Sequence, residues 1–229
     1  MSDEEIDRKI TVIFATDVVN YSKHMENDES GTVKNLRACE KILLKLFEDF
    51  KGRLFNTGGD SFLAEFPSAV SAVECAVAFQ EAIQERNKAD ETTVKLEFRI
   101  GVNSGDVIKE KDNLLGDGVN IAARLEALAQ TNGITISKGV YDFVKGKTKF
   151  EFNDIGLQKI KQNEFHAYDL MLSGYQKRQL SGSQAFKSYK ALIGICIASV
   201  SLVAVFYWFN FNAETVSYTH LTLPTTPYV

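Results

Sequence analysis

The sequence contains little cysteine and has no excess of basic residues. Its three cysteines, Cys39, Cys75 and Cys196, lie far apart and form no closely spaced Cys–Cys or Cys–His pattern. A zinc site or a disulfide framework is therefore disfavoured, and a reducing compartment is expected. Lys and Arg number 26 against 30 Asp and Glu, which gives a formal charge of −4. Because nucleic-acid binding relies on clustered positive charge, we expect no nucleic-acid partner.

The chain is long and apolar enough for one globular domain plus additional segments. It has 229 residues, of which 45% are hydrophobic, so a disordered chain is excluded. We expect a short polar N-terminus (1–8), one soluble domain (9–172) and a polar, Ser- and Gly-containing juxtamembrane linker (173–190). A short tail (210–229) follows the uncharged run at 191–209. The end of this tail, SYTHLTLPTTPYV, lacks periodicity and is expected to be non-native.

Residues 191–209 form one uncharged run, ALIGICIASVSLVAVFYWF. As a helix with a rise of about 1.5 Å per residue, this run is long enough to cross a bilayer, and Tyr207 and Trp208 lie at its end, where an aromatic belt would be. Lys and Arg precede the run and do not follow it. The sequence therefore predicts a single-pass protein of the cell membrane with its larger, N-terminal part in the cytoplasm.

The soluble part alternates between strand-like and helix-like patterns. Strands are expected at 9–18, 53–56, 61–66, 94–104, 134–137 and 164–172, and helices at 29–50, 68–87 and 117–129. This order predicts an α+β fold with helices on one face of a mainly antiparallel sheet, on the ferredoxin-like βαββαβ plan of palm-type domains.

Two acidic residues stand where this plan brings chain segments together. Asp17 ends the first strand, and Asp60 lies at the glycine-rich tip of the next hairpin, after Gly58 and Gly59. Because these elements are neighbours in a ferredoxin-like sheet, the two carboxylates are expected to face one point. Oxygen ligands without His or Cys suit Mg²⁺ or Mn²⁺, and two such ions can assist phosphoryl chemistry. Taken singly, Asp60 is equally compatible with a tight turn and Asp17 with a helix cap.

A second cluster lies in the stretch GDGVNIAARLE (116–126). Asn120 and Arg124 are four residues apart, so both project from one face of the expected helix. An amide and a guanidinium on one face suit ribose and phosphoryl oxygens. The alternative is a solvated arginine paired with an acid on its own helix.

Four stretches together resemble the catalytic domain of the class III nucleotide cyclases, the adenylate and guanylate cyclases. They are FATDVVNYS (14–22), NTGGDSFLAEF (56–66), FRIGVNSGD (98–106) and GDGVNIAARLE (116–126). The resemblance covers about 9–172 and implies homodimers with shared sites. It also implies in-line attack of a ribose 3′-oxygen on the α-phosphorus, with loss of pyrophosphate.

The resemblance assigns roles residue by residue. It implies that Asp17, Asp60 and the Val18 carbonyl hold two Mg²⁺ or Mn²⁺ ions. Asn120 would orient the ribose and Arg124 would meet the phosphates, both from the other protomer. The remaining candidate substrate-binding residues are Val19, Asn20, Tyr21 and Gly59, together with Asn56 and Asn113 for the base and His166 for the triphosphate.

The base-reading positions depart from the common pattern. Many adenylate-type members have Lys at the position of Asn56, and guanylate-type members favour Glu there. An amide both donates and accepts hydrogen bonds, so the asparagines do not select a base. ATP is the expected substrate because adenylate cyclases are the commoner single-span bacterial type. His166 replaces a usual basic residue and would bind phosphate less well.

Four alternatives stay open, and one of them, a plain membrane-anchored scaffold, explains the uncharged run but not the clustered motifs. A guanylate cyclase would use the same residues, and a catalytically silent nucleotide-binding or dimerisation module of a membrane receptor would keep the fold without the chemistry. The sequence GGDSF (58–62) also approaches the GGDEF signature of diguanylate cyclases, but Ser61 replaces its acid.

Overall fold

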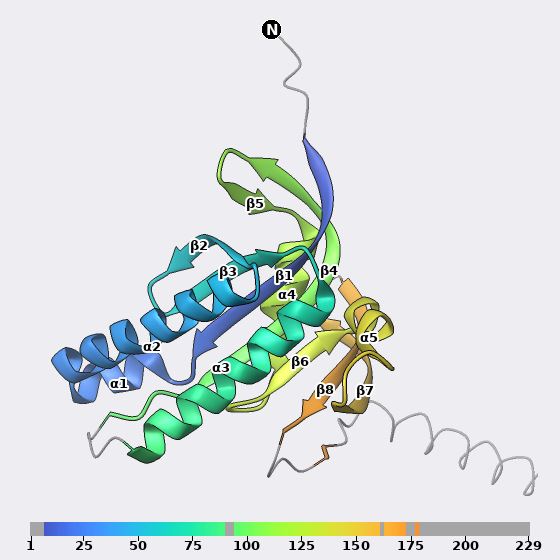
Figure 1. The fold of residues 1–229 in the computed structure, drawn as a ribbon. Coiled ribbons are helices and arrows are strands. Elements are labelled where there is room, and N and C mark those ends of the chain that lie inside the picture. Colours follow the sequence, from blue (N-terminus) through green and yellow to red (C-terminus); the bar gives the residue numbers. More distant parts are fainter. Residues whose placement is uncertain (1–6, 90–93, 161–162, 173–176, 179–229) are drawn as a thin grey trace, which may run out of the picture. The chain divides into compact units, whose positions relative to one another are not determined.

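The computed structural model describes residues 7–89, 94–160, 163–172 and 177–178. In these ranges eight strands form one sheet, and Figure 1 shows helices packed against it. The strands are β1 (Arg8–Val18), β2 (Arg53–Gly58), β3 (Ser61–Phe66), β4 (Phe98–Glu110), β5 (Asn113–Leu115), β6 (Ile134–Ser137), β7 (Glu151–Ile160) and β8 (Asn163–Met171). The helices are α1 (Tyr21–Asn27), α2 (Glu29–Asp49), α3 (Ala69–Ala89), α4 (Asp117–Leu128) and α5 (Lys138–Val144).

The strands are ordered β2-β3-β1-β4-β6-β8-β7, and β5 pairs with β4. Only the β4–β6 pairing is parallel among the strand pairs described. The first four strands, with α2 and α3 as crossovers, follow the βαββαβ plan. The predicted α+β class is therefore confirmed, and β1 lies at the centre of this half of the sheet.

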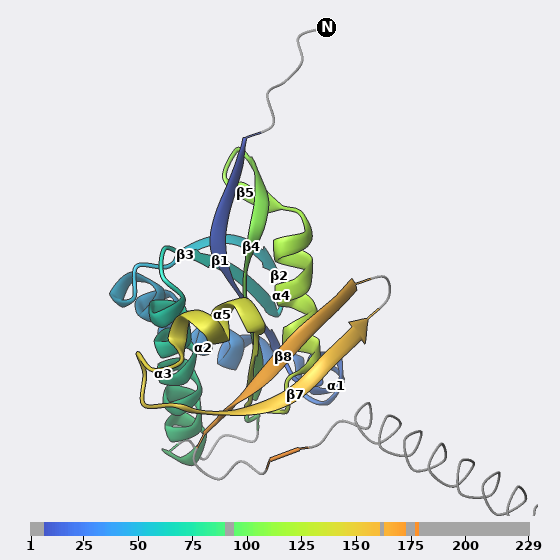
Figure 2. The same ribbon diagram turned by 90° about the vertical axis from the view of Figure 1, so that its right-hand side faces the viewer.

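Helices cover both faces of the sheet, so the prediction of helices on one face was wrong. Along β1, Val12 and Phe14 join a core with residues of α2, α3 and α5, whereas Ile13 and Ala15 pack with Ala122 of α4 on the other face. Figure 2 shows α4 on the side of the sheet opposite α2 and α3. Because the consecutive side chains of Val12–Thr16 in β1 are buried, each face of the sheet requires its own helical layer there.

Most predicted elements were found, with shifted bounds. The strand predicted at 94–104 is β4 at Phe98–Glu110, because its outer part pairs with the start of β1 and with β5. The buried Val94 and Leu96 precede this strand. The sequence did not predict α1, β5, α5 or β7, which are short or, for β7, broken by a register shift near Gly156.

Close packing of α4 on β4 depends on Gly101. A Cβ atom at this position would lie 2.2 Å from the Ala122 carbonyl oxygen and 2.2 Å from the Glu126 nitrogen. We expect Gly101→Ala to lower the free energy of unfolding by about 1–3 kcal/mol, because backbone atoms must move. Gly139→Ala, at an exposed position of α5 where a Cβ atom would meet nothing nearer than 3.8 Å, is the matched control and should change the free energy of unfolding by less than about 1 kcal/mol. Urea unfolding measures both, and equal stabilities would contradict this packing.

The C-terminal part of the chain is described only as far as 177–178. Arg178, within the predicted linker, donates two hydrogen bonds to the buried Asp169 carboxylate of β8, at 2.6 and 2.8 Å. Within the described ranges no helix has the length and hydrophobicity needed to span a membrane. The predicted span, 191–209, lies outside them.

Candidate active site

The structure brings Asp17 and Asp60 together, as the sequence predicted. Asp17 lies near the end of β1, and Asp60 lies in the two-residue turn between β2 and β3, where Gly59 has a left-handed φ of 76° that favours glycine. Burial, followed by the neighbouring Asp17 carboxyl, raises the pKa of Asp60 to about 6. Neighbouring carboxylates can serve as oxygen ligands of a divalent cation.

Two further charged residues complete this cluster, and the sequence analysis missed both. Arg99 lies directly opposite Asp17 in the β1–β4 ladder, and Glu126 projects from α4. The Arg99 Nη2 atom lies 2.9 Å from Asp17 Oδ2 and 3.2 Å from Glu126 Oε1. Burial first, and then Asp17, raises the pKa of Glu126 to about 7 against the opposing effect of Arg99. One guanidinium therefore lies between two acids, Asp17 and Glu126.

The residues that follow Asp17 form the turn into α1. Val18 is buried, and the Val19 N–H donates a hydrogen bond of 2.8 Å to the Glu97 carbonyl. Asn20 has a left-handed φ of 56° and precedes α1, whose first residue, Tyr21, packs against the core. The structure thus places Val18–Tyr21 beside the acids, while their roles as metal or substrate ligands stay predictions.

Asn120 and Arg124 both lie on α4, as predicted. Asn120 is exposed and Arg124 is partly buried. The helix begins after Gly116, whose φ is 114°, and the Asn103 side chain holds its first turn by a 2.9 Å hydrogen bond to the Gly118 carbonyl. The expected contact of Asn120 and Arg124 with a partner protomer stays a prediction, because the structure describes one chain.

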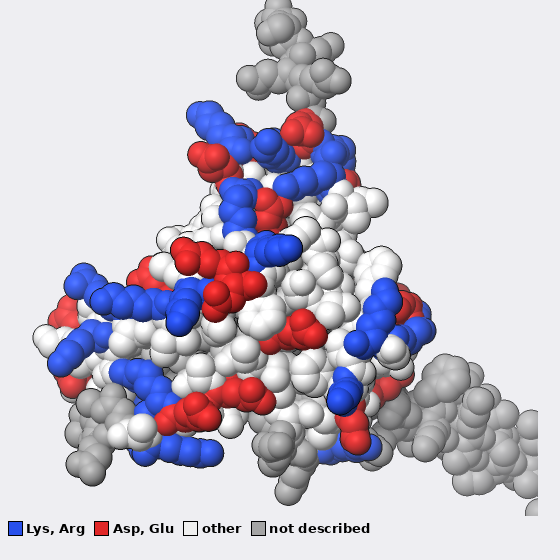
Figure 3. All heavy atoms as spheres, in the orientation of Figure 1, with Lys and Arg blue, Asp and Glu red and all other residues white. Residues whose placement is uncertain are grey.

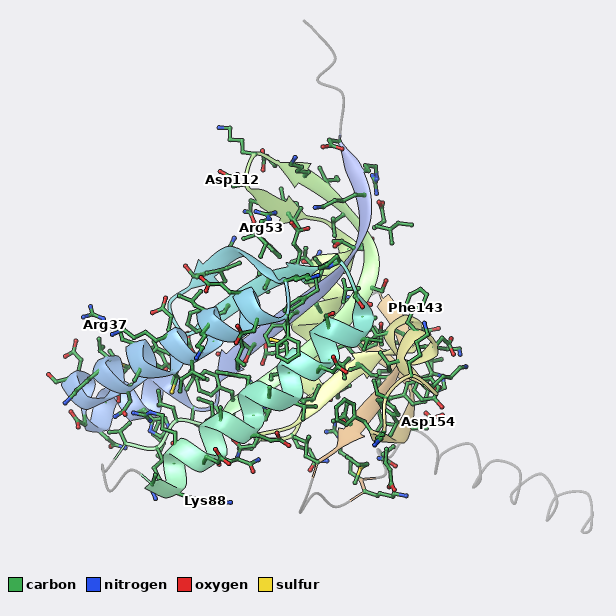
Figure 4. The ribbon with its side chains drawn as sticks, viewed as in Figure 1. Arg37, Arg53, Lys88, Asp112, Phe143 and Asp154 are labelled. Atoms are coloured by element: carbon green, nitrogen blue, oxygen red, sulfur yellow. The ribbon has the colours of Figure 1, made fainter. Side chains whose placement is uncertain are left out.

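The two residues predicted to read the base lie side by side. Asn56 on β2 donates a 3.3 Å hydrogen bond to Asn113 Oδ1 at the start of β5, and the Leu114 N–H donates to the same oxygen at 2.9 Å. They line a groove of about 800 Å³ between β2 and the β4–β5 hairpin. Asp112 lines this groove, and Figure 4 shows Arg53 near it, where Arg53 Nη1 donates a 2.9 Å hydrogen bond to the Asp112 carbonyl.

His166 lies apart from this cluster. Its neighbours on β8, Phe165 and Ala167, pack with Leu125 of α4, so His166 projects from the opposite face of the sheet. There its ring stacks on Tyr168 at 5.0 Å, and Nε2 lies 2.6 Å from Asp154 Oδ1. Nothing in a single chain places it beside the acids, so its contact with a triphosphate stays a prediction.

The donor set suits a hard divalent ion. Within the described part of the chain, no three His, Cys, Asp or Glu side chains are arranged to hold a metal ion. Any ion at Asp17 and Asp60 would therefore need further oxygen ligands from the backbone, water or substrate. This is the usual coordination of Mg²⁺, which keeps several waters and substrate phosphates among its ligands.

Metal binding at this site should depend on pH. The ion binds the ionised carboxylate, whereas the pKa of Asp60 is about 6 because of burial and Asp17. Protons should therefore compete below about pH 6, and the affinity for Mn²⁺ should fall roughly tenfold for each pH unit lost there. Titration of Mn²⁺ without nucleotide between pH 5 and 8 measures this, and an affinity that does not change with pH would contradict it.

Comparison with solved structures identifies the class of protein. A crystal structure of an adenylate/guanylate cyclase/hydrolase from Silicibacter pomeroyi matches with a TM-score of 0.69 and 30% identity, covering 74% of this chain and 100% of that one. The adenylyl cyclase CyaB from P. aeruginosa matches with a TM-score of 0.65 and 22% identity, covering 76% and 99%, and supports the fold. The fold is that of a nucleotide cyclase catalytic domain.

The family follows from the sequence comparison. The model of the adenylate and guanylate cyclase catalytic domain matches residues 2–172, and the chain belongs to this family. A Rhizobium meliloti protein named "Putative adenylate cyclase 3" is 43% identical over 165 residues, which are 72% of this chain and 28% of that protein. An adenylate cyclase of Streptomyces coelicolor is 31% identical over 58% of this chain and 34% of its own length. The chain thus matches about a third or less of these curated relatives.

Proposed function

We propose that the chain converts ATP to 3′,5′-cyclic AMP and pyrophosphate as a homodimer. The ribose 3′-oxygen forms a bond to the α-phosphorus, the bond from that phosphorus to the bridging oxygen breaks, and the hydroxyl proton is lost to solvent. The convergence of Asp17 and Asp60 beside Arg99 carries this proposal. Bound Mg²⁺ or Mn²⁺ would lower the charge on the reacting oxygens, as divalent ions do in phosphoryl transfer.

The residues around the acids have complementary roles in the proposal. Asp17, Asp60 and the Val18 carbonyl hold the ions, and Val19–Tyr21 with Gly59 border the phosphates. Asn120 and Arg124 come from the partner protomer and orient the ribose and the phosphates. The position of both residues on one face of α4, with Asn120 exposed, supports this division between protomers.

ATP is proposed as the substrate because the curated relatives from R. meliloti and S. coelicolor carry adenylate cyclase names. The Asn56–Asn113 pair offers both a donor and an acceptor in the groove, so it is compatible with adenine but does not select it. Guanine offers the opposite pattern, which a rotated amide would accept, so GTP is the alternative that the experiment must separate.

The proposal is tested by incubating the purified chain with Mn²⁺ and either ATP or GTP. Cyclic AMP from ATP, at a rate above that of cyclic GMP from GTP, is the expected result. Preferential cyclic GMP formation would make the chain a guanylate cyclase. No cyclic product from either substrate, in a preparation shown to be dimeric, would overturn the enzymatic proposal and leave a silent nucleotide-binding module.

We also propose that residues 191–209 anchor the chain in the cell membrane with the catalytic domain in the cytoplasm. The uncharged run and the preceding Lys187 and Lys190 support this. Full-length protein should remain with membranes after a high-salt wash, and protease added to sealed, right-side-out membranes should spare the domain. Release by salt, or digestion of the domain, would contradict the proposal.

A further inference from the structure

Glu126 is a buried acid with an unsatisfied oxygen beside the candidate metal site. It is 9% exposed, on the face of α4 that packs against β4 at Gly101. Its Oε1 atom is buried and accepts no hydrogen bond within the described part of the chain, although Arg99 Nη2 is 3.2 Å away. A buried carboxylate oxygen that accepts no hydrogen bond is costly even beside an ion-pair partner, so packing alone does not account for this residue.

Arg99 has a matching unsatisfied atom. Its Nη2 is shared between Asp17 and Glu126, while its Nε is buried and donates no hydrogen bond to any described residue. A side-on pair between an arginine and a carboxylate uses Nε and one terminal nitrogen together. The two unsatisfied atoms, Arg99 Nε and Glu126 Oε1, would thus both be satisfied by a side-on Arg99–Glu126 pair.

Binding of a cation would favour formation of the side-on Arg99–Glu126 pair. Asp17 Oδ2 accepts from Arg99 in the structure described here, so the guanidinium occupies the edge of the site where a positive ion would bind. With a divalent ion bound at Asp17, Arg99 would be repelled and would lose the Asp17 carboxylate as its acceptor. Without a second anion the displaced guanidinium would stay buried and unpaired, which would weaken binding of the ion.

We propose that Glu126 is a positioning residue that receives Arg99 when a divalent cation binds Asp17 and Asp60. Arg99 then moves from a position between two acids to a side-on pair with Glu126. This inference rests on the proposed metal-dependent function. It identifies the acid–arginine pair on α4 and β4 as the part of the site that responds to metal loading.

The test is a double-mutant cycle on the full-length chain, in which Mn²⁺ binding without nucleotide is measured by electron paramagnetic resonance. Glu126→Gln keeps the shape but loses the charge, and should weaken Mn²⁺ binding about tenfold. In an Arg99→Gln background no guanidinium has to be displaced, so the same change should cost less than about threefold. Thermal unfolding confirms that each variant is folded.

The outcomes separate the possible failures. If Glu126→Gln lowers the Mn²⁺ affinity equally with and without Arg99, Glu126 acts on the ion by its charge and not through Arg99. If Glu126→Gln leaves the Mn²⁺ affinity unchanged but lowers the melting temperature, its role is structural. Either result overturns the proposal. Asp17→Asn is the reference for the metal site. If Asp17→Asn binds Mn²⁺ like the unchanged chain, the proposed metal assignment fails, independently of Glu126.

A second measurement needs no variant. In the full-length chain, titration with diamagnetic Mg²⁺ should shift the Arg99 Nε–Hε resonance and slow its exchange with solvent, because Nε gains Glu126 as acceptor. An Arg99 resonance that is unchanged when Mg²⁺ saturates the site would contradict the proposed movement.

Discussion

Asp17→Ala is expected to lower metal-dependent cyclic nucleotide formation by roughly three orders of magnitude or more, because the ions lose one of two carboxylate ligands. The substitution leaves Arg99 paired with Glu126 and removes an acid that opposes the ionisation of Asp60. The fold should therefore persist, with a melting temperature within a few degrees of the original. Initial rates with Mn²⁺ and ATP, beside a melting curve, measure the two effects.

The matched control for this loss is Glu81→Ala. Glu81 is an exposed acid on α3, which packs on the face of the sheet opposite α4. Its removal should leave the rate within about twofold of the original, since surface substitutions away from a site change little. If Asp17→Ala retained comparable activity, Asp17 would not be a metal ligand.

Mixing two inactive variants should restore activity. In a dimer with shared sites, each site combines the acids of one chain with helix α4 of the other. When an Asp17→Ala chain pairs with an Arg124→Ala chain, both substitutions fall in the same site. A heterodimer therefore keeps one site in which both halves are intact. Random pairing makes half of the dimers mixed, so roughly a quarter of the original activity should return.

Asp17→Ala mixed with Asp60→Ala is the control for that experiment. Both substitutions damage the metal half, so each site of the mixed dimer carries one lesion and no activity should return. Recovery in the first mixture and none in the second supports a site built by two protomers. Absence of rescue in the first, with subunit exchange demonstrated, would place Arg124 and Asp17 in the same chain's site or remove Arg124 from it.

The acids of the site could be predicted because their positions depend on local patterns. Asp17 ends an apolar strand, and Asp60 follows two glycines at a hairpin tip, so the strand order alone brings them together. Arg99 and Glu126 could not be found in this way. Arg99 meets Asp17 only through the β1–β4 register, and Glu126 reaches the site only because Gly101 admits α4.

The errors in the fold have similar causes. Helix α5 has seven residues and buries only Val140 and Val144, which is too short a pattern for periodicity to reveal. Strand β7 is interrupted where Gly156, with a φ of 78°, shifts the register. The face on which His166 lies depends on alternation along β8, whose pairing to β6 is long-range. Each of these features is set by tertiary contacts.

The distribution of charge on the surface does not locate the candidate active site. Figure 3 shows basic and acidic side chains interspersed over the projecting β4–β5 hairpin and along the helices in view. The informative charges are the partly buried ones, since Asp17, Arg99 and Glu126 lie beneath this outer layer with side chains 24%, 28% and 12% exposed. Burial rather than surface charge therefore marks the candidate active site.

Anomalous diffraction from crystals grown with Mn²⁺ and a non-hydrolysable ATP analogue would locate the metal ions and the nucleotide in one experiment. We expect two manganese peaks roughly 2.1 Å from carboxylate oxygens of Asp17 and Asp60, with Asn120 and Arg124 of a second protomer facing the nucleotide. Manganese bound elsewhere, or a nucleotide contacted by Asn120 and Arg124 of the same chain that supplies the acids, would contradict this expectation.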